Sequence, residues 1–253
     1  SPDALSGSIV YYDGRVDDAR LVVTLVRTAV RYGALAASRV QVVDIERDEY
    51  GKVKGAVLLD VEHDRQFKVR TKRIIVATGV WTEQTEGLAE GDEGLKVMTS
   101  KGIHIIVPKD AINSEVGLFL RTEKSVLFII PWKYYWLIGT TDTPYHQELR
   151  EPVADEADID YLIEHANEVL KDKLTREDVI GTFAGLRPLL QPADKSTGQS
   201  TKVSREHTVT EVIPGVTVIA GGKLTTYRQM AEDAVDFALG KQLSKEIPSV
   251  TDR

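Results

Sequence analysis

The segment VTVIAGGKLTTYR, residues 216–228, passes directly from a strand-forming sequence into two glycines and then into a polar sequence typical of a helix start. Its first five residues, 216–220, are β-branched or small, which predicts a buried strand. Residues 225–239 predict a helix. The apolar face of that helix comprises Met230, Ala234, Phe237 and Ala238. The order strand, glycine turn, helix indicates an α/β arrangement.

The glycine turn is itself a candidate anion site. Gly221 and Gly222 let a ligand approach the backbone closely, because they carry no side chain. The predicted helix offers unpaired N–H groups and the positive end of its dipole, and Lys223 adds a mobile cation. This arrangement suits a phosphate or another electron-rich group. A plain turn, with Thr225 capping the helix, is an equally weighted alternative.

The N-terminal part of the chain shows a similar mixture. Residues 8–12 predict a short strand and residues 17–32 a helix. Strands of a small antiparallel meander are expected at residues 39–45, 53–62 and 66–70. The run RIIVATG at residues 73–79 is continuously apolar after Arg73, so we expect a strand that is buried on both faces and ends in a small-residue turn.

The middle of the chain is β-rich. Short strand-forming runs recur at residues 103–107, 117–121, 125–130 and 135–140. Their close spacing predicts a second, antiparallel sheet. Residues 155–171 predict a helix, and the polar residues 192–202 predict a loop. The apolar face of the helix comprises Ile159, Leu162, Ile163, Ala166 and Leu170.

Together these patterns predict an α/β (α+β) fold. We expect a mixed sheet from the two ends of the chain and an antiparallel sheet from its middle. The expected divisions are residues 1–95, 96–180 and 181–253, with the first and third parts in one domain and the second inserted as another.

The composition limits the function classes. The 253 residues carry a formal net charge of -7, which argues against nucleic acid as a partner, because phosphate backbones favour basic surfaces. A local basic cluster can still bind a small phosphate. The absence of cysteine excludes disulfides and thiolate sites and fits a reducing cytoplasm. No apolar run approaches the roughly 20 residues that a membrane-spanning helix needs.

Two arginines are candidate phosphate ligands. Arg187 lies in an apolar stretch between Leu186 and Pro188, so it needs a partner if it is buried. Arg205 lies in the polar segment SREH, residues 204–207. A guanidinium group can bind a phosphate with two parallel hydrogen bonds. The alternative is a salt bridge to an acidic residue, and for Arg205 alone this alternative is the favoured interpretation.

His104 is the candidate proton acceptor. In a strand it shares a face with Ile106 and lies opposite to Ile103 and Ile105. A neutral imidazole could accept a proton from an alcohol, whereas the plainer interpretation is a half-buried structural histidine. The five histidines are scattered, and no pair has the spacing of metal ligands. We therefore expect no zinc or iron site.

Several longer motifs together resemble one family. No G-x-G-x-x-G follows a strand, and there is no P-loop or nucleophile elbow. The chain nevertheless resembles the FAD-dependent glycerol-3-phosphate dehydrogenase family, a branch of the D-amino-acid-oxidase-like flavoproteins. The matching segments, in the family's order, are YYDGRVDDARL (11–21), IIVATGVW (74–81), SKGIHIIVP (100–108), LFIIPW (127–132), LIGTTDTPY (137–145), LTREDVIGTFAGLRPLL (174–190), SREH (204–207) and AGGKLTTYRQMAEDAVD (220–236). Because the family's G-x-G-x-x-G segment is not among them, we expect a central-to-late portion of a family member.

The resemblance implies how an FAD cofactor would be held. Residues 1–95 and 181–253 would form part of the FAD-binding domain, and residues 96–180 the substrate-binding domain. The strand ending at Val40 resembles the one whose backbone contacts the adenine. The turn Ala77, Thr78 and Gly79 resembles the one beside the ribose and pyrophosphate. The segment Gly222, Lys223, Leu224 and Thr225 resembles the one that faces the pyrimidine edge of the flavin.

The resemblance also implies a reaction. Arg187, Arg205 and Lys223 resemble the cluster that binds the substrate's phosphate and hydroxyls, and His104 resembles a histidine near the reacting carbon. The reaction would oxidise sn-glycerol 3-phosphate to dihydroxyacetone phosphate by hydride transfer to flavin N5. Quinone or oxygen would be the acceptor. A cytoplasmic protein held peripherally at the inner face of the cell membrane is implied, and a homo-oligomer is compatible with the resemblance.

Two alternatives stay open at this stage. One is a related flavin oxidase that acts on amines or amino acids. The basic cluster of Arg187, Arg205 and Lys223 argues instead for a phosphorylated substrate. The other is an inactive substrate-binding fragment, an interpretation that rests on the absence of the phosphate-binding loop.

Overall fold

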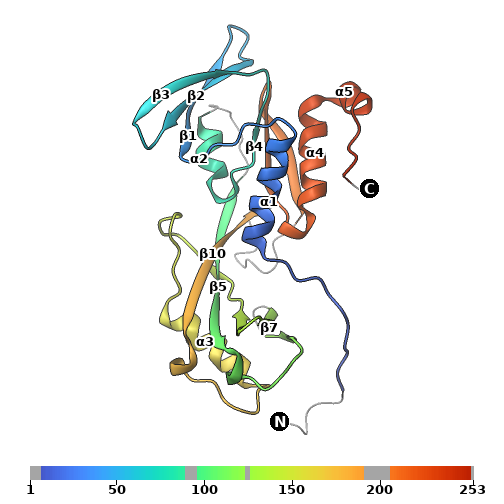
Figure 1. Ribbon diagram of the computed structural model, residues 1–253. Helices are drawn as coiled ribbons and strands as arrows, with labels where there is room; N and C mark the ends of the chain where they lie inside the picture. The colour runs from blue at the N-terminus through green and yellow to red at the C-terminus, as the bar shows by residue number, and fades with distance from the viewer. Residues whose placement is uncertain (1–6, 89–95, 123–125, 191–205, 252–253) are drawn as a thin grey trace.

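The computed structural model describes residues 7–88, 96–122, 126–190 and 206–251. Figure 1 shows two lobes connected by two long strands, β5 (Val97–Pro108) and β10 (Gly181–Leu190). One lobe is a sheet covered by a helix, and the other combines a small mixed sheet, a meander and several helices. The α/β (α+β) class expected from the sequence is therefore confirmed.

The first lobe is built on a six-stranded antiparallel sheet. Its strand order is β10-β5-β8-β7-β6, and β9 pairs with β5. The remaining strands are β6 (Leu118–Arg121), β7 (Val126–Trp132), β8 (Tyr135–Gly139) and β9 (Thr143–Pro144). This sheet confirms the antiparallel one predicted for the middle of the chain. It also contains β10, which lies just beyond the expected division at residue 180 and pairs with β5 along its whole length.

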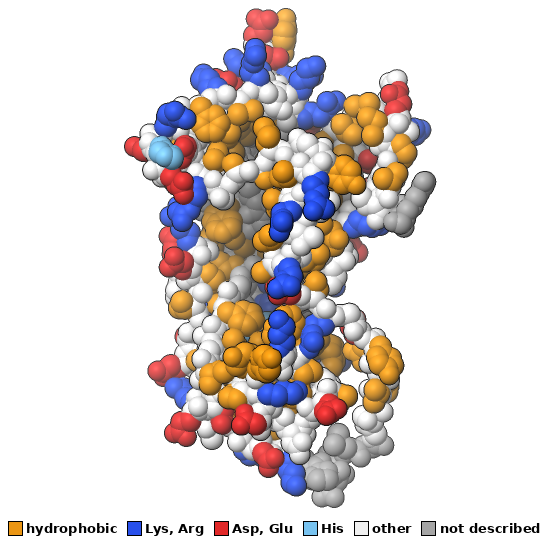
Figure 2. Space-filling view, in the orientation of Figure 1, with side chains coloured by type: hydrophobic (Ala, Val, Ile, Leu, Met, Phe, Trp, Pro, Cys, Tyr) orange, Lys and Arg blue, Asp and Glu red, His pale blue; other side chains and the backbone are white. Residues whose placement is uncertain are grey.

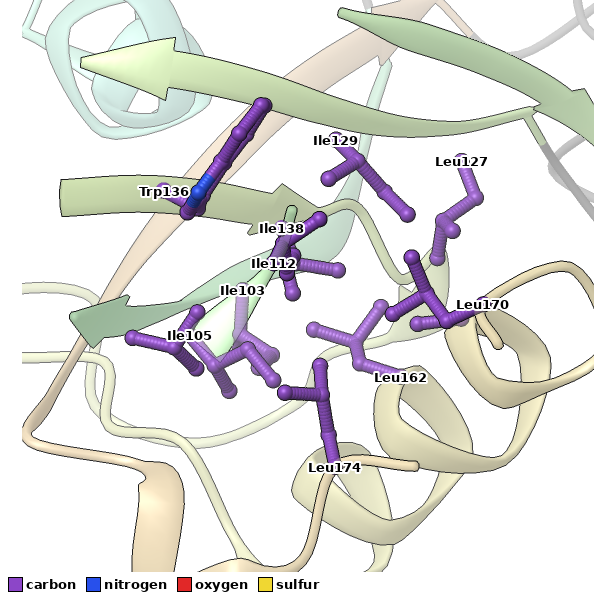
Figure 3. Close-up of a cluster of buried hydrophobic side chains, with 12 residues drawn as sticks. Ile103, Ile105, Ile112, Leu127, Ile129, Trp136, Ile138, Leu162, Leu170 and Leu174 are labelled. Carbon is purple, nitrogen blue, oxygen red and sulfur yellow. The ribbon is translucent and has the colours of Figure 1, made fainter. Parts of the chain in front are cut away.

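One face of this sheet forms the larger hydrophobic core. Because side chains alternate along a strand, Ile103, Ile105 and Val107 of β5 all point to this face and are fully buried. Helix α3 (Glu156–Asn167) covers the face with Leu162 and its neighbours. Figure 3 shows Leu162, Leu170 and Leu174 directed at the isoleucines of the sheet. The helical face predicted from the sequence is confirmed.

A buried ion pair fixes α3 to the sheet. Lys101 of β5 has a side chain that is 8% exposed, and its Nζ lies 2.6 Å from Asp158 and 2.9 Å from Asp155. Burial alone would lower the pKa of Lys101, but the hydrogen bonds that its ammonium group donates to Asp158 and Asp155 outweigh burial and raise the pKa. Asp155 also caps α3 by accepting from the backbone N–H of Asp158. The helix start is therefore held in one position on the strand.

The second lobe contains a three-stranded sheet in the order β11-β12-β4. Its strands are β11 (His207–Ile213), β12 (Val216–Gly221) and β4 (Ile74–Val76), and β12 runs parallel to β4. Helices α4 (Tyr227–Leu239) and α5 (Lys241–Glu246) follow β12, and the short helix α2 (Thr82–Gly87) follows β4. The meander is β1 (Val40–Arg47), β2 (Val53–Asp60) and β3 (Arg65–Arg70). The buried strand at residues 216–220 and the meander are confirmed.

Helix α1 (Asp18–Arg31) is one residue shorter at each end than the range 17–32 expected from the sequence, and Asp17 caps its start. None of its residues is buried, and Val23, Val26 and Val30 of its apolar side are exposed. The amphipathic spacing thus predicted the helix correctly. It did not predict that, in the part of the chain that the structure describes, the apolar side of the helix is left uncovered.

Three expectations are corrected. Residues 8–12 are extended but not a strand, and Tyr12 is fully exposed, because no described strand lies beside them to pair with. The strand expected at residues 73–79 is limited to β4, and Ile75 is 41% exposed because β4 is an edge strand of its sheet. Phe237 is exposed rather than part of a covered helix face. The loop predicted at residues 192–202 lies outside the described residues.

The packing of α3 predicts a large loss of stability for Leu162→Ala. Leu162 is fully buried against the sheet, so its truncation should lower the free energy of unfolding by about 2–5 kcal/mol. Urea denaturation measures this value. Val153→Ala is the matched control, since Val153 is 71% exposed and should change the free energy by less than about 0.5 kcal/mol. Equal effects would contradict the proposed core.

Candidate functional site

The face of the six-stranded sheet opposite to α3 carries the polar candidates. Ser100, Gly102 and His104 alternate with the buried residues of β5 and therefore share this face. The register places Arg187, Gly185 and Phe183 of β10 directly across from them, in that order. We call this surface the open face. The structure thus brings His104 and Arg187, predicted separately from the sequence, to neighbouring positions on one surface.

The imidazole of His104 is held between two neighbouring strands. It stacks on the Phe183 ring with centroids 4.8 Å apart and planes 4° from parallel. On the other side it lies over Gly139 of β8, where an added Cβ would collide with the ring. Gly139 lies directly across from His104 in the register. The sheet therefore needs a glycine at this position to accept the histidine side chain.

This environment keeps His104 neutral. Burial and, to a smaller extent, the positive charge of Arg187 lower its pKa from 6.5 to about 4, against an opposing effect of Asp18 at the start of α1. At neutral pH the imidazole is uncharged and keeps one nitrogen lone pair, so it can accept a proton or a hydrogen bond.

The side chain of Arg187 lies flat on the neighbouring strand β5. Its guanidinium group packs on Gly102, where an added Cβ would overlap it. Nη1 donates to the Thr141 carbonyl at 3.1 Å, and Nη2 donates to Thr140 Oγ1 at 2.9 Å. The prediction that Arg187 needs partners is confirmed. Its side chain is still 30% exposed.

A second group of predicted residues lies at the carboxyl ends of the parallel strands β4 and β12. Open α/β sheets bind ligands outside this edge. Thr78 follows β4, and its buried Oγ1 has no hydrogen-bond partner among the described residues. Gly79 has a φ of 58° and open space around it. The turn that follows Ala77 therefore contains a buried hydroxyl without a described partner and a backbone with open space around it. Both are features of a ligand-binding turn.

The glycine turn after β12 is confirmed as one that requires glycine. Gly221 and Gly222 have φ values of 80° and 76°, which favour glycine. Side chains at these positions would meet the Glu206 carbonyl and the Met230 sulfur, respectively. The segment that follows differs from the prediction, because Leu224–Thr226 form a 3-10 turn and α4 begins only at Tyr227.

Lys223 lies at the start of that 3-10 turn and is exposed. Its backbone N–H donates to Thr226 Oγ1 at 3.4 Å, and its side chain makes no ion pair with any residue that the structure describes. Leu224 and Thr225 are also exposed. The cation expected beside the glycine turn is therefore present at its surface.

The two groups of residues lie on neighbouring elements. The turn Gly79–Trp81 contacts both β5 and β10, and β12 contacts β10. Figure 2 shows a hollow along the middle of this side of the molecule, with hydrophobic side chains beside it and Lys and Arg side chains nearby. A ligand that reaches from the β4 and β12 edge to the open face would lie along these contacts.

Two predicted residues do not join these groups. Val40 is the first residue of β1 and does not end a strand, because the chain turns at Arg39, which has a φ of 60°. Arg205 lies outside the described residues.

Several site residues were missed from the sequence. Phe183, Gly139 and Asp142 each contact His104 or Arg187. The alternation of Ser100, Gly102 and His104 was a usable signal, but their partners on β8 and β10 depend on the register.

Within the described ranges, no group of three His, Asp or Glu side chains could hold a metal ion. In the same ranges, no helix has the length and apolar content needed to cross a bilayer.

The burial and charges around His104 predict a low pKa for its imidazole. Its pKa, followed by NMR of the imidazole Cε1–H signal, should be about 4. Arg187→Gln should raise this pKa by removing a positive charge, while burial keeps the value below 6.5. A His104 pKa at or above 6.5 would contradict the described burial.

The same shift fixes how His104 affects stability. The unfolded chain takes up a proton on this histidine near pH 6.5, whereas the folded chain does so only near pH 4. The contribution of His104 to stability should therefore be present above pH 6.5 and be lost as the pH falls toward 4. His104→Gln should flatten this part of the pH profile in urea denaturation.

Comparisons with known proteins show the family of the chain. A family model described as FAD dependent oxidoreductase (DAO) matches residues 1–228. Glycerol-3-phosphate dehydrogenase of Mycobacterium leprae is 44% identical over 250 residues, which are 99% of this chain and 42% of that protein. The chain therefore spans less than half the length of this curated relative.

Solved structures give the same picture. Glycerol-3-phosphate dehydrogenase from Bacillus halodurans, complexed with FAD, matches with a TM-score of 0.78 and 32% identity, covering 89% of this chain and 43% of that one. Glycine oxidase from Bacillus cereus matches with a TM-score of 0.61 at 18% identity, covering 89% of this chain and 57% of that one, and shows a shared fold alone. The present chain belongs to the FAD dependent oxidoreductase (DAO) family.

Proposed function

We propose that the protein to which this chain belongs oxidises sn-glycerol 3-phosphate to dihydroxyacetone phosphate with FAD as its cofactor. The observation that carries the proposal is the placement of a neutral His104 beside a partly exposed Arg187 on the open face. The chain contributes a base and a phosphate ligand on one surface, and these are the two groups that this substrate needs. The relatives named glycerol-3-phosphate dehydrogenase support the choice of substrate.

The residues at the β4 and β12 edge fit an FAD cofactor. Thr78 has a buried hydroxyl without a described partner, which a ribose or pyrophosphate oxygen would satisfy. The glycine turn at Gly221 and Gly222 places no side chain between its backbone and an electron-rich ring edge. Ala77, Thr78 and Gly79 would hold one part of the cofactor, and Gly222, Lys223, Leu224 and Thr225 another. When bound, FAD would accept the hydride from C2 of the substrate at flavin N5.

The open face would bind and orient the substrate. Arg187 would bind the phosphate through its exposed edge, and we propose that Lys223 and Arg205 complete the basic cluster. The neutral imidazole of His104 would accept the proton of the C2 hydroxyl. Phe183 and Gly139 fix the plane of that imidazole, so the base would meet the hydroxyl in one orientation.

We also propose that quinone or oxygen takes up the electrons and that the intact protein associates peripherally with the inner face of the cell membrane. Oxygen consumption measured against reduction of a water-soluble quinone distinguishes the acceptors. Co-sedimentation with liposomes tests the membrane association. A homo-oligomer is proposed from the resemblance alone, and analytical ultracentrifugation tests it.

The substitution Arg187→Ala in the intact protein tests the phosphate ligand. The KM for glycerol 3-phosphate should rise roughly 10- to 100-fold, which is the effect of losing a charged hydrogen bond. Arg176→Ala is the matched control, because Arg176 pairs with Asp160 on the far edge of α3, away from the open face. Unchanged turnover and affinity in Arg187→Ala would remove Arg187 from the site.

The substrate class is tested by anaerobic bleaching of the flavin. Glycerol 3-phosphate should bleach the oxidised flavin of the intact protein, whereas glycine and sarcosine should not, because neither carries a phosphate for Arg187. Bleaching by the amines alone would favour the amine oxidase alternative. A preparation that binds no FAD would contradict the proposed cofactor.

A further inference from the structure

A buried carboxylate, that of Asp142, lies beside Arg187 and has no role in the reaction proposed above. The side chain of Asp142 is 3% exposed, and its Oδ1 lies 3.6 Å from Arg187 Nη1. Ser100 Oγ donates a hydrogen bond to the same oxygen. Burying a carboxylate is costly unless it is paired and hydrogen-bonded. Asp142 is therefore buried at a place where its only described cationic partner is Arg187, the proposed phosphate ligand.

The segment that carries Asp142 is fixed to β5. Thr141 is 3% exposed, and its Oγ1 accepts a hydrogen bond from the Ile103 backbone N–H at 3.1 Å. Thr143, one residue beyond Asp142, pairs with Lys101 as part of β9. Thr140 and Thr141 both accept hydrogen bonds from the guanidinium of Arg187. Thr140, Thr141 and Asp142, which contact the Arg187 guanidinium, thus lie in one short segment that β5 holds from both sides.

The opposite side of the guanidinium is limited by Gly102. An added Cβ at Gly102 would overlap the guanidinium carbon and both terminal nitrogens. Arg187 therefore lies in a slot whose floor is the glycine and whose rear wall is residues 140–142. An arginine side chain ordinarily has many rotamers, and this slot selects one of them before any ligand arrives.

We infer that Asp142 is a positioning residue that, together with Ser100, holds the Arg187 guanidinium in the orientation that receives the substrate's phosphate. This inference rests on the proposed function and deepens it. Asp142 would not touch the substrate. Its carboxylate would engage the rear of the guanidinium, so that the exposed edge presents its N–H groups outward.

An alternative role for Asp142 predicts the opposite sign. A carboxylate that merely neutralises Arg187 would weaken phosphate binding, and its removal would then tighten binding. A positioning carboxylate strengthens binding, because the ordering of the guanidinium precedes the binding of the ligand. The two roles are therefore separable by the direction in which affinity changes.

The test compares Asp142→Asn and Ser100→Ala with the wild-type intact protein. Asp142→Asn keeps the shape and removes the charge, whereas Ser100→Ala keeps the charge and removes the hydrogen bond that orients it. The KM for glycerol 3-phosphate and the dissociation constant of inorganic phosphate, measured by calorimetry, are the two readouts. Asp160→Asn is the control, since Asp160 pairs with the surface residue Arg176.

Asp142→Asn should raise both constants by roughly tenfold or more, and Ser100→Ala should raise them in the same direction by less. The turnover number should change little, as expected for a lost binding interaction. The flavin spectrum and melting temperature show whether each variant is folded. If Asp142→Asn does not fold, the Ser100→Ala result decides.

Unchanged or lower constants in folded variants would overturn the inference, and so would a loss of turnover without a change in either constant. A wild-type protein that binds phosphate but does not oxidise glycerol 3-phosphate would contradict the proposed function instead. Because phosphate binding is measured without turnover, the role of Asp142 can still be decided in that case.

Discussion

The antiparallel pairing of β5 with all 10 residues of β10 is the constraint on which the remaining structure depends. It places His104 across from Phe183 and Arg187 across from Ser100, so a slip of β10 by one residue would turn Arg187 and Phe183 away from His104 and toward α3. The same strands run from one lobe to the other. The contacts of β10 with β12, and of β5 with the Gly79–Trp81 turn, therefore couple the open face to the proposed cofactor edge.

Glycines set the shape of the open face. Gly102 and Gly139 leave space on the sheet in which Arg187 and His104 lie flat rather than standing away from it. Both side chains are thus partly buried against the sheet. Burial keeps His104 neutral, while Arg187 is hydrogen-bonded to Thr140 and Thr141 and paired with the carboxylate of Asp142. The sheet therefore supplies a base and a cation side by side.

Much of this arrangement was predictable from local pattern. The alternation in β5 assigned His104 to the face opposite Ile103, the glycine pair predicted the turn after β12, and amphipathic spacing predicted α1 and α3. The site partners were not predictable, because Phe183, Gly139 and Asp142 meet the candidates through strand register and not through sequence proximity. The prediction of burial was also wrong for Ile75 and Phe237, because the sequence shows that a residue is apolar but not whether a neighbour covers it.

The central claim is that the open face binds glycerol 3-phosphate between Arg187 and His104. A crystal structure of the intact protein with FAD and a non-oxidisable analogue of glycerol 3-phosphate tests it most directly. The phosphate is predicted to contact the guanidinium of Arg187, with the analogue's C2 substituent within hydrogen-bond distance of the His104 imidazole. An analogue bound in the FAD-containing protein with its phosphate away from Arg187, or with C2 away from His104, would contradict the claim.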